Sequence, residues 1–155
     1  MSSLVATPDE RLAELGLELP EFPSLPFTPR LRPVLVHDGL AYLSGLGPVG
    51  VEGRIGDTMS VEEGYEAART TGLLALRRIV DELGALDRVR RWVKVLGFVR
   101  SADGFADQPA VVNGFTDLVV EVYGEERGLA ARSAIGVSEL PTGIPVEVEA
   151  IVAVQ

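Results

Sequence analysis

The segment from Ser60 to Gly84 constrains the fold of this chain more than any other. Ser60 and Glu63 have the spacing of a capping box, in which two side chains satisfy backbone N–H groups at the start of a helix. Gly84 is the residue type that most often ends one. Between these ends, small and apolar residues recur at intervals of three and four, which predicts one long helix with a single buried face. They are Tyr65, Ala68, Gly72, Ala75, Ile79 and Leu83.

A helix with one buried face needs another layer against it, and the rest of the chain supplies strands and a second helix. Period-two or β-branched patterns predict five strands. They cover residues 34–37, 40–46, 87–100, 131–140 and 145–154. The first two strands are joined by Asp38-Gly39, which is typical of a β-hairpin. A second helix is predicted from Asp107, with Pro109 in its first turn, to Gly124.

The N-terminal 33 residues have a different character. Thr7, Pro8 and two acidic residues predict the start of a short helix, and Gly16 predicts its end. The segment 20–33 contains five prolines, which cannot donate to a strand ladder. We therefore predict a helical arm and an extended connector over residues 1–33, followed by one domain over 34–155.

The order of elements predicts an α+β fold, an α/β sandwich with two main helices on one face of a mixed sheet. In the last strand, valines and Ala150 alternate with Glu147, Glu149 and two apolar residues, so both faces of this strand carry apolar side chains. The helices can cover only one face. The other face is expected to pack against further subunits around polar groups.

Charge and composition exclude several classes of function. The chain has 14 Lys and Arg against 23 Asp and Glu, a net charge of −9, which argues against binding nucleic acid or an anionic membrane. It has no cysteine and one histidine, His37, so no metal site and no cofactor are predicted. Residues 1–9 lack the pattern of a targeting signal, and no apolar run is long enough to span a membrane. A cytoplasmic location is the expectation.

Few side chains remain for chemistry. His37, Asp38 and Ser44 would form a hydrolytic set only if folding brought them together, and a hairpin histidine at the surface is the simpler interpretation. Glu147 and Glu149 lie two residues apart in a strand, so they share a face and could form a carboxylate pair. An exposed or subunit-facing strand surface explains them equally well.

Several motifs taken together resemble the RidA family, also called the YjgF family. They are the segments 131–141, 146–151, 42–48 and 84–89, and Asn113 in the second helix. The resemblance runs in the expected order from about Val34 to the end of the chain. The arm and connector resemble a longer subgroup, often labelled chorismate-mutase-like or endoribonuclease.

The resemblance implies the Bacillus chorismate mutase-like fold and a homotrimer with ligand sites in the clefts between subunits. It implies that Arg132 clamps the carboxylate of a 2-imino or 2-enamino acid, because a planar guanidinium pairs with a carboxylate through two hydrogen bonds. It implies that Glu147 holds or activates the water that releases ammonia and a 2-oxo acid. Ser44 and Asn113 would line the same substrate-binding pocket.

Leu46, Gly47 and Gly136 depart from the residues usual in deaminating members of the family. Two alternatives therefore stay open beside the deaminase. One is a non-catalytic module that binds a metabolite or regulates, and the other is a chorismate-mutase-like enzyme, which would need a second cationic contact. The endoribonuclease label fits poorly with the net charge of −9.

Overall fold

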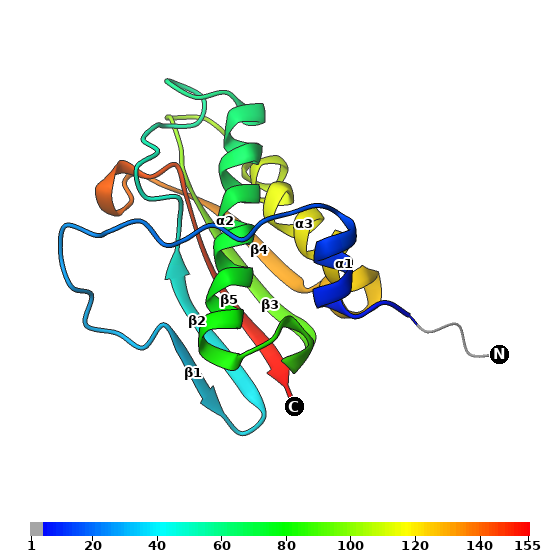
Figure 1. Ribbon diagram of the computed structural model, residues 1–155. Coiled ribbons are helices and arrows are strands. Elements are labelled where there is room, and N and C mark those ends of the chain that lie inside the picture. Colours follow the sequence, from blue (N-terminus) through cyan, green and yellow to red (C-terminus); the bar gives the residue numbers. More distant parts are fainter. Residues whose placement is uncertain (1–4) are drawn as a thin grey trace.

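A computed structural model describes residues 5–155 as one five-stranded sheet with helices on one of its faces (Figure 1). The elements are α1 (Pro8–Glu14), β1 (Val34–His37), β2 (Leu40–Leu46), α2 (Val61–Leu83), the 3₁₀ turn η1 (Leu86–Arg88), β3 (Val89–Arg100), α3 (Gln108–Gly128), β4 (Ala131–Val137), the 3₁₀ turn η2 (Pro141–Gly143) and β5 (Val146–Val154). The predicted α+β class, with a mixed sheet and two main helices on one face, is confirmed. Residues 1–4 of the predicted N-terminal region 1–33 lie outside the described residues.

The sheet has the strand order β1-β2-β5-β3-β4, which places the C-terminal strand at its centre. β3 and β4 run parallel, whereas the other neighbouring pairs are antiparallel. On β5 the residues that face the helices are buried, and their neighbours in sequence lie on the opposite, uncovered face. The buried ones are Val146, Val148, Ala150, Val152 and Val154.

Helix α2 begins and ends where its sequence predicts. The Ser60 hydroxyl accepts the Glu63 N–H at 3.1 Å, and the Glu63 carboxylate accepts the Ser60 N–H at 3.4 Å. Gly84 ends the helix with a φ of 95°, a backbone conformation that favours glycine. The buried face of α2 packs on α3 at close range, because a Cβ on Gly114 would collide with the carbonyl oxygen of Tyr65.

The side chain of Trp92 on β3 is buried against α3. Its indole ring makes edge contacts with the rings of Phe115 and Tyr123, at centroid distances of 5.7 and 5.9 Å. The Tyr123 hydroxyl donates to the Leu86 carbonyl at 2.9 Å. These aromatic contacts join α3 to β3, the strand next to the central β5.

Three element ends differ from the predictions. α3 continues past Gly124, where the backbone breaks with a φ of 77°, and ends at Gly128. The strand β3 starts at Val89 rather than at residue 87, because residues 86–88 form the 3₁₀ turn η1. The first N–H groups of η1 donate to a side chain of the N-terminal arm. The Asp9 carboxylate accepts the N–H groups of Leu86 and Asp87 at 3.1 and 3.0 Å. The strand β4 ends at Val137, three residues early.

The arm and the connector lie against the helical layer. α1 packs on α3, and the Arg11 side chain donates to the Glu121 carbonyl at 3.2 Å. From α1 the connector crosses in front of α2 and then turns down toward β1 (Figure 1). Where it crosses, the Arg78 guanidinium stacks over the Phe22 ring at 4.3 Å. The connector is thus fastened to α2 before it enters the sheet.

Candidate functional site

The face of the sheet that no helix covers carries both apolar and charged side chains. Leu35, Tyr42 and Ile135 are 52%, 40% and 43% exposed on this face. Their register places Leu35 beside Tyr42 on the β1–β2 pair, and Ile135 beside Phe98 on the β3–β4 pair. A sheet face with several large apolar side chains exposed is typical of a surface that contacts a partner.

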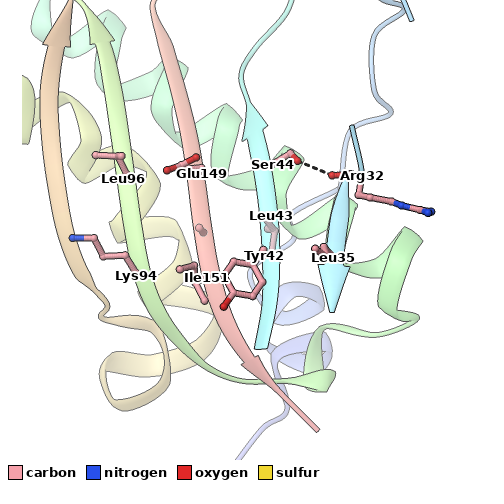
Figure 2. Close-up of a pocket in the computed structure, with 10 residues that line it drawn as sticks. Arg32, Leu35, Tyr42, Leu43, Ser44, Lys94, Leu96, Glu149 and Ile151 are labelled. Atoms are coloured by element: carbon pink, nitrogen blue, oxygen red, sulfur yellow. Dashed lines mark hydrogen bonds between the residues drawn. The ribbon is translucent and has the colours of Figure 1, made fainter. Parts of the chain in front are cut away.

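A cavity of about 460 Å³ opens on this face. Figure 2 shows its lining residues, which include Tyr42, Ser44, Lys94 and Glu149, in front of the strands, with the helices behind. The Lys94 ammonium is 3.5 Å from the Ser133 hydroxyl and forms no ion pair within residues 5–155. Arg32 belongs to the lining, but its guanidinium extends away from the other side chains (Figure 2).

Arg132 lies on the edge strand β4 and faces the helical layer. It is in register with the buried Val95 of β3. Its guanidinium donates to Asn113 Oδ1 at 2.9 Å and to Thr116 Oγ1 at 3.1 Å, and it lies 3.5 Å from the Pro109 carbonyl. All three acceptors are neutral groups of α3, so Arg132 has no carboxylate partner among the described residues.

Six other arginines of the chain are paired with acids among the described residues, whereas Arg88 and Arg91 donate to backbone carbonyls. Arg54 and Arg100 both bind Glu139, at 2.6 and 2.9 Å, and these two bonds hold the pKa of Glu139 below its usual value. Arg69 binds Glu121 at 2.9 Å, across α2 and α3. Arg132 therefore differs from these arginines in keeping a positive charge that no acid neutralises.

Glu147 lies on the opposite side of the sheet from Arg132. Its alternation with the buried Val146 and Val148 turns the carboxyl toward the uncovered face, where it is half-buried. Burial raises the pKa of Glu147, and the nearby charge of Glu149 raises it further. Among the described residues, no side chain or backbone group donates a hydrogen bond to this carboxylate.

Gly45 of β2 and Gly47 of the following loop allow a close approach to β5. A Cβ on Gly45 would lie 3.0 Å from the carboxyl carbon and Oε2 of Glu147. A Cβ on Gly47 would collide with the Val146 carbonyl oxygen. Glycine at position 47 thus has a local cause, which is the close approach of this loop to β5.

The four predicted site residues fall into two groups in one chain. Arg132 and Asn113 are hydrogen-bonded on the helical side, whereas Glu147 and Ser44 belong to the uncovered side. Ser44 donates to the Arg32 carbonyl at 2.6 Å (Figure 2), so it also holds the end of the connector. The His37 Nε2 atom lies 3.2 Å from the carboxylate of the exposed Asp38, at the hairpin end of β1.

The sequence reasoning missed Thr116, a polar neighbour of Arg132, and Gln108, which lies beside Gly136. Thr116 follows Asn113 by three residues in a helix, so helical spacing alone could have placed both hydroxyl and amide on one face. Gln108 was also missed: its Nε2 would lie 2.7 Å from a Cβ on Gly136. The Gln108 side chain thus fills the space next to Gly136.

Within residues 5–155 no helix is long and apolar enough to cross a membrane, and no group of three or more His, Asp or Glu side chains is placed to hold a metal ion. The geometry defines the class as a two-layer α+β protein with one open sheet face and cavities of metabolite size. The family described as endoribonuclease L-PSP matches residues 26–154. The chain therefore belongs to that family, which is the RidA (YjgF) family.

Known relatives agree with this assignment. Protein TCP17 of Trypanosoma cruzi is 46% identical over 100 residues, which are 64% of this chain and 62% of that protein, so the match spans less than two thirds of its length. The structure of Atu1372 from Agrobacterium tumefaciens, a protein of unknown function, is 32% identical with a TM-score of 0.82, over 96% of this chain and 92% of that one. A proposed endoribonuclease from Shewanella oneidensis MR-1 is 25% identical with a TM-score of 0.87, over 96% and 100% of the two chains.

A more distant structure shares the fold. Escherichia coli TdcF with bound serine is 21% identical, with a TM-score of 0.54, over 83% of this chain and 91% of that one. The Agrobacterium and Shewanella structures match this chain over a larger share of its length. The arm and the connector therefore have counterparts in at least part of the family.

Proposed function

We propose that this protein binds a small carboxylate-bearing metabolite in the clefts of a homotrimer and hydrolyses 2-imino or 2-enamino acids to 2-oxo acids and ammonia. The observation that carries the proposal is the state of Arg132. In a chain of net charge −9, this guanidinium is held by an amide, a hydroxyl and a carbonyl oxygen rather than by an acid. The serine bound to TdcF, which also has a carboxylate, supports a ligand of this kind.

Arg132 suits the role of a carboxylate clamp. A guanidinium pairs with a carboxylate through two parallel hydrogen bonds and stays protonated, so it orients and neutralises the substrate rather than acting as a base. Asn113 and Thr116 accept from the same guanidinium nitrogen, Nη1. They fix the plane of the group and leave the charge for the ligand.

Glu147 is proposed as the residue that activates water. Its raised pKa brings it closer to the range in which a carboxylate takes a proton effectively near neutral pH. Water adds to the C=N carbon as Glu147 accepts one of its protons, and Glu147 then gives this proton to the nitrogen, which forms the carbinolamine and restores the carboxylate. The carbinolamine then expels ammonia as the C=O bond forms, so one water enters and one ammonia leaves.

The proposal requires more than one copy of the chain. Arg132 and Glu147 face opposite sides of the sheet, so a ligand that contacts both must lie between Arg132 of one copy and Glu147 of another. The exposed apolar side chains of Leu35, Tyr42 and Ile135 support such an assembly through the uncovered face.

The test is release of ammonia and 2-oxo acid from freshly generated 2-iminobutanoate or 2-aminoacrylate. We expect the wild type to exceed the uncatalysed rate, and Arg132→Ala and Glu147→Gln to lose at least about tenfold in kcat/KM. Arg54→Ala is the matched control, because that arginine is paired with Glu139 away from the site. A wild-type rate equal to that of Arg132→Ala and of buffer alone would refute deamination.

One observation favours a second candidate, a metabolite-binding module without catalysis. Within a single chain, Arg132 has no acid or base beside it, so it can bind a carboxylate without promoting any reaction. Thermal stabilisation by small carboxylates that disappears in Arg132→Ala, in the absence of turnover, would establish this alternative.

A further inference from the structure

A second cavity, of about 290 Å³, lies between the proline-rich connector and the ends of β2 and β5. Its walls are mainly apolar, and its ionisable lining residues are Glu147 and Arg78. The apolar walls come from Phe22, Leu25, Phe27 and Leu31 of the connector and from Leu46 and Ile144. The connector thus builds a large part of the surroundings of Glu147.

The connector is held at both sides of this cavity. On the α2 side, Arg78 stacks on Phe22 at 4.3 Å. On the β2 side, the Ser44 hydroxyl donates to the Arg32 carbonyl at 2.6 Å and the Ser44 N–H donates to the Pro33 carbonyl at 3.1 Å. The prolines between these points limit the backbone further. A cavity fixed in this way exists before a ligand arrives, which lowers the entropic cost of binding.

Two kinds of group in the cavity lining lack a partner, and they indicate the chemistry of a ligand. Leu25, Phe27 and Leu31 remain 38%, 51% and 51% exposed, although each borders the cavity. Beside them, the half-buried Glu147 carboxylate has no hydrogen-bond donor among the described residues. An apolar body with one hydrogen-bond-donating nitrogen would cover the first group and satisfy the second.

The size of the cavity favours a metabolite over a peptide. A volume of about 290 Å³ is near the lower end of the roughly 300–1,000 Å³ typical of small-molecule sites. The cavity is concave and contains a carboxylate, whereas a contact between subunits buries flatter and more extensive surfaces.

We propose that the connector is the specificity element of the Glu147 site, where it receives a branched aliphatic or aromatic side chain while a nitrogen of the ligand donates to Glu147. The inference rests on the proposed function in one respect, which is that Glu147 meets the metabolite. It adds the substrate class: amino-acid-derived metabolites with apolar side chains are preferred over those with a methyl group.

Calorimetric titration of the full chain with two series of probes tests this inference. The first series is pyruvate, 4-methyl-2-oxopentanoate and phenylpyruvate, which all carry a carboxylate. The second is acetamide, 3-methylbutanamide and phenylacetamide, which carry no charge and can donate from nitrogen. In both series we expect the branched and aromatic members to bind at least about tenfold more tightly than the methyl member, because they bury more apolar surface.

Phe27→Ala should remove most of that preference, and Leu31→Ala should reduce it. Thr28→Ala is the matched control, since this exposed residue adjoins Phe27 in the sequence and does not line the cavity. Both tested side chains are about half exposed, so the variants are expected to fold, which their circular dichroism melts will verify.

The outcomes separate the two proposals. Oxo acids that bind without a side-chain preference, or a preference that survives Phe27→Ala and Leu31→Ala, overturn the role of the connector and leave the carboxylate site intact. In a second outcome, the amides bind with a side-chain preference that depends on the connector, and no oxo acid binds. That outcome supports the connector as the specificity element and refutes the carboxylate site. Failure of both series refutes both proposals. A change of oligomeric state in Phe27→Ala during sedimentation assigns this wall to a subunit contact and also overturns the inference.

Discussion

The two faces of the sheet show how one strand can serve two purposes. On the helical face, Val148 and Val152 of β5 are almost fully buried beneath the helical layer. On the other face of the same strand, Glu147 is half-buried and Glu149 is exposed. The free energy of folding therefore comes largely from the covered face, and the open face can carry charges and cavities at little cost to stability. Along β5, residues two positions apart therefore lie on the same face of the sheet and contribute alike to stability, whereas adjacent residues lie on opposite faces and differ.

The largest expected effect comes from the covered face. Phe115→Ala removes a buried ring that contacts Trp92, so we expect a loss of about 3–5 kcal/mol in the free energy of unfolding. Urea denaturation followed by circular dichroism measures it. Phe105→Ala is the control, because that ring is only partly buried. Equal losses for the two variants would contradict the view that the helical layer dominates stability.

A substitution on the open face is expected to affect association of the chains rather than folding. Ile135→Glu places a charge on an exposed apolar position of β4, so we expect the proposed trimer to dissociate while each chain stays folded. Sedimentation velocity and circular dichroism measure the two properties. Val36→Glu is the matched control: Val36 is 50% exposed, but its register with Ala41 puts it on the helical side. Dissociation by both variants, or by neither, would break the proposed difference between the faces.

A smaller effect is expected at the boundary between connector and sheet. Ser44→Ala removes the hydrogen bond to the Arg32 carbonyl, which costs about 0.5–1.5 kcal/mol. The segment 20–33 should then be cleaved faster in limited proteolysis, because its end is no longer held. Ser24→Ala, in the exposed part of the connector, should change neither quantity. Unchanged cleavage in Ser44→Ala would show that this bond does not hold the connector.

The smallest effect on stability concerns Glu147. Its pKa in the folded chain is raised above the unfolded value, so the wild type loses stability as pH rises through the window between those two values. Glu147→Gln cannot ionise and avoids that loss. We therefore expect the stability of Glu147→Gln relative to the wild type to increase with pH through this window and to stay constant above it. Thermal melts from pH 4 to pH 8 measure the trend.

Glu149→Gln provides the comparison for that prediction. It removes the charge that raises the pKa of Glu147 but leaves the burial, which is the larger cause. The pH trend should therefore be weaker than in Glu147→Gln. A trend of equal size would assign the shift to repulsion between the two carboxylates rather than to burial.

Much of the fold follows from local patterns in the sequence. The capping boxes at Thr7 and Ser60 fix where α1 and α2 begin, since each satisfies its own N–H groups within one turn. The break at Gly124 was predicted, but the helix resumes beyond it. Local signals cannot reveal that, because it depends on tertiary contacts. One is the bond from the Arg127 side chain to the Arg90 carbonyl, at 3.2 Å.

The candidate site was predicted residue by residue but not as an arrangement. The alternation of side chains along one strand tells which residues share a face, and it correctly predicted that Glu147 and Glu149 do. Alternation within a strand does not tell which face of one strand lies on the same side as which face of another. The registers of β4 with β3 and of β3 with β5 show that Arg132 and Glu147 face opposite sides of the sheet. The sequence also could not predict that the connector lines a cavity. A proline-rich segment has no hydrophobic periodicity that shows which part of the fold it packs against.

Trp92 gives the molecule a built-in optical reporter. It is the only tryptophan in the chain, and its indole is buried on the helical face among Phe115 and Tyr123. Its fluorescence will change when the helical layer separates from the sheet. It lies on the opposite side of the sheet from Glu147 and Glu149. A second tryptophan, introduced on the open face, would be needed to report by fluorescence on events beside those two carboxylates.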